Sequence, residues 1–202
     1  MQSHDRRAMI VLASASPRRQ ELLCNAGIPF TVQAANINET PLAGEAPRDC
    51  AERLAREKAL AVAGSRQREW VLGADTIVVV DEIALGKPRD LSDAARMLRM
   101  LSGRTHEVIT GVCLVGSVAS GQWSVASGAK TSSETTLVTM CEISDAEIRD
   151  YIATGEPMDK AGAYAIQGIA SRWIPRIEGD YSNVVGLPVA LVYRMLRERG
   201  AL

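Results

Sequence analysis

Histidine is almost absent from this chain of 202 residues, which contains only His4 and His106. Two histidines exclude a histidine metal cluster, and a Ser-His-Asp triad would depend on His106, which has no G-x-S-x-G partner in the sequence. Near the start of an expected strand, His106 is more typical of a structural hydrogen-bond donor than of a catalyst. Any metal bound by this chain should therefore be a hard cation with oxygen ligands.

Paired cysteine motifs are also lacking. The chain has four widely separated cysteines and no C-x-x-C pair, namely Cys24, Cys50, Cys113 and Cys141. This spacing excludes a zinc knuckle and a thioredoxin motif. The pattern instead predicts buried free thiols in a reducing compartment, which favours the cytoplasm.

Three further signals are missing: a strong net charge, a long apolar run and the common phosphate-binding motifs. The formal net charge is -1, so there is no sequence-wide basic signal for nucleic acid, and a small partner is expected. No run approaches the ~18 apolar residues of a membrane span. Neither G-x-G-x-x-G nor G-x-x-x-x-G-K-[ST] occurs, so side chains would have to hold any phosphates.

Composition and length are those of an ordinary folded protein. Apolar residues make up 47% and charged residues 23%, and a chain of this size can bury roughly 70% of its unfolded surface. We expect residues 1–8 to form a disordered tail and residues 9–202 a single two-lobed domain. Residues 4–15 mimic a short signal peptide, but the proline, the arginines and the amphipathic helix that follow are typical of the first strand and helix of a fold.

The central stretch of the sequence is residues 70–88, where one acid, Asp75, interrupts an apolar run before a turn and Lys87. The near-continuous β-branched residues predict a strand covered on both faces. A carboxylate in that position must be paired, bound to a metal or shifted in pKa. The small residues Gly73 and Ala74 would leave room for a ligand. Asp75 is thus either an active-site base or an acid that closes a strand or caps a turn.

Two arginines follow the first expected strand, residues 9–14. Ser16 and Pro17 predict the start of a helix, which places Arg18 and Arg19 in its first turn. Cations there oppose the helix dipole and are a poor choice for stability alone. The pair therefore either binds an anion, such as a phosphate, or is simply solvated.

Other polar residues allow two interpretations each. Lys58 falls among the apolar positions of a helix expected at residues 47–63, where a lysine more commonly lies along the helix face than points its ammonium into a cleft. Glu39, in a polar loop, is a metal ligand or a surface charge. Gln167, in a glycine-rich segment, either contacts a ligand or is a surface amide at a tight sheet crossing.

The remaining elements follow from periodicity and turn signals. Strands are expected at residues 31–35, 83–85, 105–115, 135–143 and 174–177, and helices at 93–101, 144–153 and from 188 onward. Ser92 is the expected N-cap of the helix at residues 93–101. Residues 116–128 should form a mobile hairpin connection. Irregular alternation of strands and helices predicts an α/β fold: a mixed twisted sheet with flanking helices and a smaller lobe that forms a deep cleft.

Separated short motifs in this order resemble the Maf family of nucleoside triphosphate pyrophosphatases. The resemblance runs from about Ile10 to the last helix. Its motifs are SASPRR at 14–19, NE at 38–39, REKA at 56–59, GADT at 73–76, GKP at 86–88, DKAGAYAIQG at 159–168 and NVVGLP at 183–188. The family fold implied is a mixed α/β sheet with a deep cleft, similar to the inosine triphosphate pyrophosphatases.

The resemblance also implies site residues. It makes Asp75 the proton acceptor, and Gln167 points to the branch that hydrolyses dTTP and UTP to the monophosphate and pyrophosphate. It further implies that the substrate-distinguishing positions are Arg18, Thr76 and Gln167. The positions that would bind the triphosphate are Arg19, Lys58 and Lys87. Glu39 would be a ligand for Mg²⁺ or Mn²⁺. The family usually has an acid where this chain has Asn38.

Alternative functions remain open at this point. One is a non-catalytic nucleotide-binding protein or an interaction protein that inhibits septum formation, and another is the same chemistry on 7-methyl-GTP. A binding module needs no buried acid such as Asp75 facing phosphates, because the two repel unless a metal intervenes. The expected partner is a nucleoside triphosphate, with no nucleic acid and no membrane, and a homodimer is compatible with the sequence.

Overall fold

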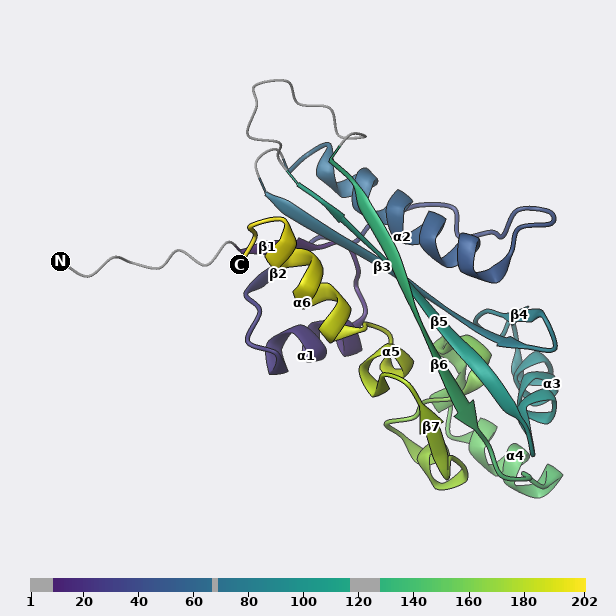
Figure 1. Ribbon diagram of the computed structural model, residues 1–202. Coiled ribbons are helices and arrows are strands. Elements are labelled where there is room, and N and C mark those ends of the chain that lie inside the picture. Colours follow the sequence, from purple (N-terminus) through teal and green to yellow (C-terminus); the bar gives the residue numbers. More distant parts are fainter. Residues whose placement is uncertain (1–8, 67–68, 117–127) are drawn as a thin grey trace.

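A seven-stranded mixed sheet forms the centre of the computed structural model, which describes residues 9–66, 69–116 and 128–202. The strand order is β2-β1-β3-β5-β6-β7, and β4 pairs with β3 outside this path (Figure 1). The strands are β1 Ile10–Leu12, β2 Phe30–Val32, β3 Trp70–Val80, β4 Ile83–Leu85, β5 Thr105–Val115, β6 Lys130–Thr139 and β7 Arg176–Glu178. Only the pairings of β1 are parallel. The mixed α/β fold expected from the sequence is thereby confirmed.

Helices cover both faces of this sheet. They are α1 Pro17–Asn25, α2 Pro47–Ala63, α3 Leu91–Leu101, α4 Asp145–Ala153, α5 Tyr181–Val185 and α6 Val189–Glu198, with short 3₁₀ turns η1 Glu156–Asp159, η2 Ala161–Ala163 and η3 Ile169–Trp173. Along β1, Ile10 and Leu12 pack with α1 and α6, whereas Val11 packs with α2. Strand alternation therefore assigns α2 to one face and α1 and α6 to the other.

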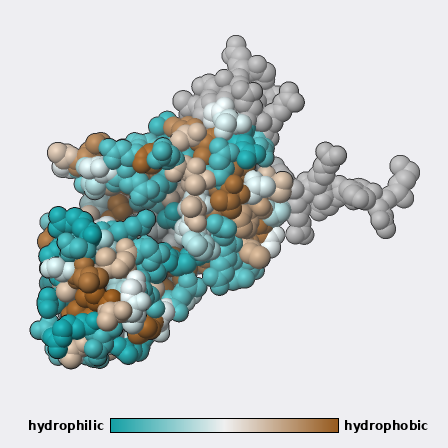
Figure 2. Space-filling view, turned by 180° about the vertical axis from the view of Figure 1, so that it is seen from behind, coloured by the Kyte–Doolittle hydropathy of each residue, from teal (hydrophilic) through white to brown (hydrophobic). Residues whose placement is uncertain are grey.

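A separate core lies at the far end of the long strands, where α3, α4 and the 3₁₀ turns pack together (Figure 1). Its largest fully buried side chain is Tyr151 of α4. From behind, the surface is indented between an upper and a lower mass at the left of the view (Figure 2). The long strands β3 and β5 connect the two ends, so side chains in the middle of β3 lie between separately packed cores.

Several expected boundaries needed correction. The strand expected at residues 135–143 is β6, five residues earlier at its start, and α5 was not expected at all. The cap of α3 is Asp90, whose carboxylate accepts from the Asp93 amide at 2.7 Å, and not Ser92. The capping box of Ser144 and Glu147 is confirmed. The expected tail and most of the hairpin connection, residues 117–127, lie outside the described residues.

Gly73 makes room for a helix, which corrects the expectation that it makes room for a ligand. A Cβ at Gly73 would lie 2.1 Å from the Ala55 carbonyl oxygen, and one at Gly111 would lie 2.3 Å from that of Ala51. Because β3 and β5 carry no side chain at these two points, α2 rests directly on the backbone of the sheet. This close contact places Lys58, one turn further along α2, above Asp75.

The free thiols are only partly as expected. All four cysteines are unpaired, but Cys24 and Cys141 are exposed, while Cys50 and Cys113 are buried. Cys24 lies near the end of α1 and Cys141 follows β6, and neither position faces a core. Among the described residues, no helix combines the length and the apolar character needed to cross a membrane.

His106 has the structural role expected from the sequence. It is buried, and its Nε2 shares a hydrogen bond of 2.8 Å with the Tyr164 hydroxyl. Burial lowers the pKa of His106 to about 4. The ordinary value is about 6.5, so in the intervening pH range the unfolded chain takes up a proton that the folded protein does not.

This difference predicts an acid-sensitive fold. As pH falls from about 6.5 to about 4, the free energy of unfolding should drop by about 3 kcal/mol because of His106 alone. Urea unfolding at a series of pH values measures it. In His106→Gln, which has no titrating ring, this part of the pH dependence of the free energy of unfolding should vanish. An unchanged pH dependence would assign the acid sensitivity to other groups.

Candidate active site

All the site residues predicted from the sequence line one cleft. The cleft has a volume of ≈ 640 Å³ and lies beside the middle of β3. Its walls come from the start of α1, the loop before α2, α2 itself, the turn after β4 and the segment that follows α4. The predicted residues that line it are Arg18, Arg19, Glu39, Lys58, Asp75, Thr76, Lys87 and Gln167.

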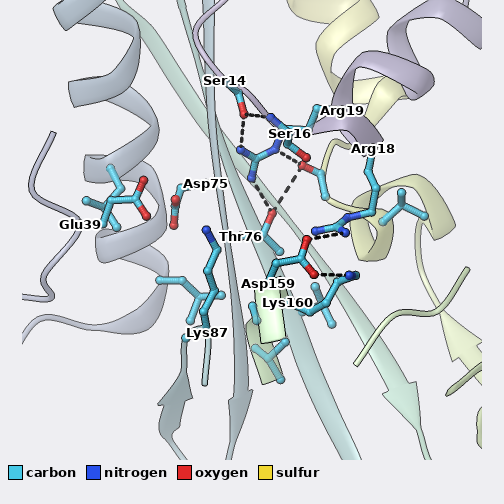
Figure 3. A pocket seen from close by; sticks show the side chains of 18 of the residues that line it. Ser14, Ser16, Arg18, Arg19, Glu39, Asp75, Thr76, Lys87, Asp159 and Lys160 are labelled. Atoms are coloured by element: carbon cyan, nitrogen blue, oxygen red, sulfur yellow. Dashed lines mark hydrogen bonds and ion pairs between the residues drawn. The ribbon is translucent and has the colours of Figure 1, made fainter. Parts of the chain in front are cut away.

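The acid at the centre of the cleft is paired with a lysine. Lys58 Nζ donates to Asp75 Oδ1 at 2.6 Å and lies 2.7 Å from Glu39 Oε1. Lys58 and Asp75 are buried. Of the two interpretations of Lys58, the structure therefore shows the one that was less common on general grounds: two carboxylates draw its ammonium into the cleft. Figure 3 shows Glu39 and Asp75 side by side, with Lys87 pointing toward them.

Glu39 remains ionised in this arrangement. Burial by itself raises its pKa, but the hydrogen bond and charge of Lys58, together with the charges of Lys87 and Arg19, lower that pKa below its ordinary value. The site thus combines two carboxylates and several cations in one small volume.

The loop that carries Glu39 is held against α2 by an ion pair. Arg53 donates to both carboxylate oxygens of Glu45, at 2.6 and 2.8 Å, and to the Thr40 carbonyl at 3.3 Å. Asn38, where the family usually has an acid, accepts from the backbone amide and the hydroxyl of Thr40 at 3.0 and 2.7 Å. Its side-chain oxygen therefore stabilises the loop.

Arg19 joins three separate elements. Its guanidinium donates to the Gly186 carbonyl at 2.8 Å and to the hydroxyls of Ser14 and Thr76, each at 3.1 Å (Figure 3). Burial lowers the pKa of Arg19, while the charges of Asp75 and Glu39 act in the opposite direction. A guanidinium stays protonated in proteins, so Arg19 places a fixed positive charge at the start of α1.

A buried network of hydrogen bonds holds the two residues that Arg19 contacts on β3 and after α5, Thr76 and Gly186. The hydroxyls of Thr76 and Thr110 share a hydrogen bond of 3.0 Å, and Thr110 donates to the Asn183 carbonyl at 3.1 Å. The side-chain amide of Asn183 donates to the Val108 carbonyl at 2.9 Å and to the Thr136 hydroxyl at 3.0 Å. These bonds tie α5 to the sheet and so fix the Gly186 carbonyl that Arg19 contacts.

Two cleft residues were not singled out from the sequence, although they begin one of the quoted motifs. Asp159 lies 3.4 Å from an Arg18 nitrogen and forms an ion pair with Lys160 (Figure 3). Burial raises the pKa of Asp159, but Lys160 and Arg18 lower it overall. Nothing local marks Asp159 as a partner of Arg18, because the two are 141 residues apart in the chain.

Carboxylate oxygens are the cleft groups suited to a divalent cation. In the described part of the chain no group of three or more His, Cys, Asp or Glu residues gathers around a common point. Glu39 and Asp75 nevertheless aim oxygens at one shared cation, the Lys58 ammonium. Mg²⁺ is commonly held by one or two carboxylates together with substrate phosphates. The donor set therefore fits a divalent cation that arrives with a phosphorylated substrate.

Fold and site together define an α/β protein whose cleft gathers arginine and lysine side chains around a buried carboxylate. Comparison with known proteins agrees with the motifs. The chain belongs to the family described as Maf-like protein, whose family model matches residues 9–199.

The similarity to individual proteins covers nearly the whole chain. This chain is 58% identical to the "dTTP/UTP pyrophosphatase" of Koribacter versatilis, over 96% of this chain and 95% of that protein. The protein of the same name from Geobacter sulfurreducens is 53% identical, over 96% of this chain and 97% of its own. A solved structure, that of the Staphylococcus aureus Ham1 protein, covers 95% of this chain and 99% of its own with 14% identity and a TM-score of 0.48.

Proposed function

We propose that this protein hydrolyses dTTP and UTP to the nucleoside monophosphate and pyrophosphate, with Asp75 as general base. The observation that carries the proposal is the position of Asp75, a buried carboxylate in a cleft whose walls supply Arg18, Arg19, Lys58 and Lys87. The names of the two relatives, at 58% and 53% identity, support the choice of substrates.

The chemistry requires a water to be activated, the charge on the phosphoryl group to be neutralised and the leaving pyrophosphate to be held. Asp75 takes the proton of the water. Lys58, between Asp75 and Glu39, orients both carboxylates and brings a positive charge to the phosphates. Arg19 and Lys87 approach the phosphates from α1 and from the turn after β4.

Glu39 would help to hold a divalent cation, Mg²⁺ or Mn²⁺, which when bound polarises the phosphoryl oxygens. This part of the proposal has its own test. Removing divalent cations with a chelator should stop turnover, and adding back Mg²⁺ or Mn²⁺ should restore it. Titration of the metal together with inorganic triphosphate into the parent and into Glu39→Gln, followed by calorimetry, tests the ligand without relying on activity.

Gln167 faces the other end of the substrate. It lines the cleft together with Arg18 and Thr76, the positions proposed to distinguish bases. Uracil and thymine present an N3–H donor beside carbonyl acceptors, and a single glutamine amide can pair with both kinds of group. The Thr76 hydroxyl is already bonded to Arg19 and Thr110, so it contributes mainly by holding Arg19.

The experiment that tests the proposal is an assay of pyrophosphate release from a panel of nucleoside triphosphates. We expect UTP and dTTP to be the best substrates. Preference for 7-methyl-GTP would assign the chain to a different branch of the family chemistry. Tight nucleotide binding without pyrophosphate release, with metal present, would favour a sensor.

The proposed location in the cytoplasm rests on the four free thiols.

Lys87 provides a prediction about the phosphates. In Lys87→Ala the KM for UTP should rise more than tenfold, because a charge pair in a cleft exceeds the roughly 1 kcal/mol of an exposed pair. Arg89→Ala is the matched control, since Arg89 follows two residues later and its side chain is 84% exposed. Arg18 is proposed to bind the triphosphate as well as to distinguish bases, so Arg18→Ala should raise the KM in the same way. Equal KM values in parent and both cleft variants would place these cations outside the phosphate site.

A further inference from the structure

The turn that carries Gln167 is held from behind by two side chains outside the cleft lining, Tyr151 of α4 and Glu156 of η1. The Tyr151 hydroxyl donates to Glu156 Oε1 at 2.8 Å and accepts from the Ala165 amide at 3.2 Å. The Glu156 carboxylate in turn accepts from the Ile169 amide, at 3.1 Å to Oε1 and 3.3 Å to Oε2. The turn is thus fixed two residues before and two residues after Gln167.

The contact between Glu156 and this turn is close enough to exclude a side chain. A Cβ at Gly168 would lie 2.3 Å from Glu156 Oε1. The Gly168 amide donates to the Ala165 carbonyl at 3.0 Å, which closes the turn around Ile166 and Gln167. The backbone on which Gln167 is mounted therefore has one short internal bond and two external anchors.

One of the two anchors, Tyr151, belongs to the hydrophobic core around α3 and α4. Tyr151 is 1% exposed, and its ring packs edge to face on Trp173 with centroids 5.3 Å apart. Burial, and to a smaller extent the hydrogen bond to Glu156, raises the pKa of the Tyr151 hydroxyl. The hydroxyl therefore keeps its proton at neutral pH. The Tyr151 ring is thus fixed by packing in the core, and its hydroxyl, which donates one hydrogen bond and accepts another, fixes the turn relative to that core.

We propose that Tyr151 and Glu156 are positioning residues that set where the Gln167 amide meets the base, and so determine substrate selectivity. This inference rests on the proposed function, in which Gln167 contacts the base. The cations that face the phosphates come from other elements, namely α1, α2 and the turn after β4. Loosening the turn should therefore weaken recognition of the base and leave recognition of the phosphates unchanged.

The first test compares Tyr151→Phe with the parent. The variant keeps the packed ring and removes only the hydroxyl, so the Ala165 amide and Glu156 lose their common partner. We expect the KM for UTP to rise about tenfold while kcat changes by less than about twofold, because a weakened hydrogen bond to the base removes binding that is equal in the ground state and the transition state. The inhibition constant of inorganic triphosphate, which has no base, should not change. Tyr193→Phe, at a tyrosine that is 48% exposed on α6, is the matched control.

A graded pair of variants tests the carboxylate. Glu156→Gln keeps one oxygen for Tyr151 and Ile169 and should retain most of the UTP preference, whereas Glu156→Ala should reduce the ratio of kcat/KM for UTP over GTP about tenfold. Hydrogen exchange of the Ala165 and Ile169 amides in the free protein gives a readout independent of turnover. Exchange should accelerate at Ala165 in Tyr151→Phe and at both amides in Glu156→Ala.

Distinct results overturn the two proposals. If the parent hydrolyses UTP and dTTP, but Tyr151→Phe keeps the parental KM, selectivity and amide exchange, the positioning role is wrong and the proposed function stands. An equal loss of UTP and inorganic triphosphate binding in the variants would also overturn the positioning role, because it indicates general loosening. If the parent releases no pyrophosphate from either nucleotide, the proposed function fails, and selectivity through this turn fails with it.

Discussion

Replacing Asp75 with asparagine should reduce kcat by about 10²–10⁴-fold, the range associated with a positioned general base. Nucleotide binding should remain or become tighter, because the amide removes one negative charge near the phosphates. The side chain keeps its shape, and its oxygen can still accept from Lys58, which lies 2.6 Å away in the parent. Single-turnover assays with metal present measure the chemical step, and calorimetry with UTP measures binding.

Asp81→Asn is a suitable control for this experiment. Asp81 lies in the turn directly after β3, and its side chain is 58% exposed and paired with Arg104. The control should retain parental kcat within about twofold, as expected for a surface substitution. Turnover by Asp75→Asn within a few-fold of the parent, under the same metal concentration, would remove Asp75 from the role of base.

Changing Gln167 to glutamate is expected to have the second-largest effect, a loss in kcat/KM for UTP and dTTP of about 1–3 kcal/mol or more. The carboxylate has no donor, so it opposes a carbonyl of uracil that the glutamine amide can satisfy. A guanine edge, which has adjacent N1–H and N2–H donors, is better matched by a carboxylate. Activity on a guanine nucleotide could therefore rise, although Arg18 and Thr76 also line this part of the cleft.

Steady-state kinetics with UTP, dTTP, GTP and 7-methyl-GTP measure this change. Gln33→Glu, which adds the same charge outside the cleft lining, is the control. Inhibition by inorganic triphosphate separates a lost base contact from repulsion between the new charge and the phosphates. If Gln167→Glu keeps the parental preference for UTP over purine triphosphates, Gln167 does not contact the base, and the proposed substrates lose their structural support.

Local patterns in the sequence predicted most elements of the fold but not all their limits. The β-branched run of β3 and the helical spacing of α2 are strong short-range signals, and both elements lie where they were expected. The start of α3 was misplaced because Asp90 and Ser92 are both good caps, and only the structure shows which of them bonds the helix. α5 has five residues, too few for helical periodicity to be recognised.

The sequence motifs, grouped through their resemblance to a family, identified the predicted site residues that line the cleft, but not Asp159 and Lys160. What each side chain touches was decided only by tertiary structure. Lys58 turns toward Asp75, 17 residues away, because Gly73 and Gly111 let α2 rest on the sheet. Arg19 meets the Gly186 carbonyl across 167 residues, and Glu156 holds the Gln167 turn through bonds to Ile169, 13 residues on. Each of these contacts depends on where separate elements pack against one another, and short-range conformational preference contains no information about that packing.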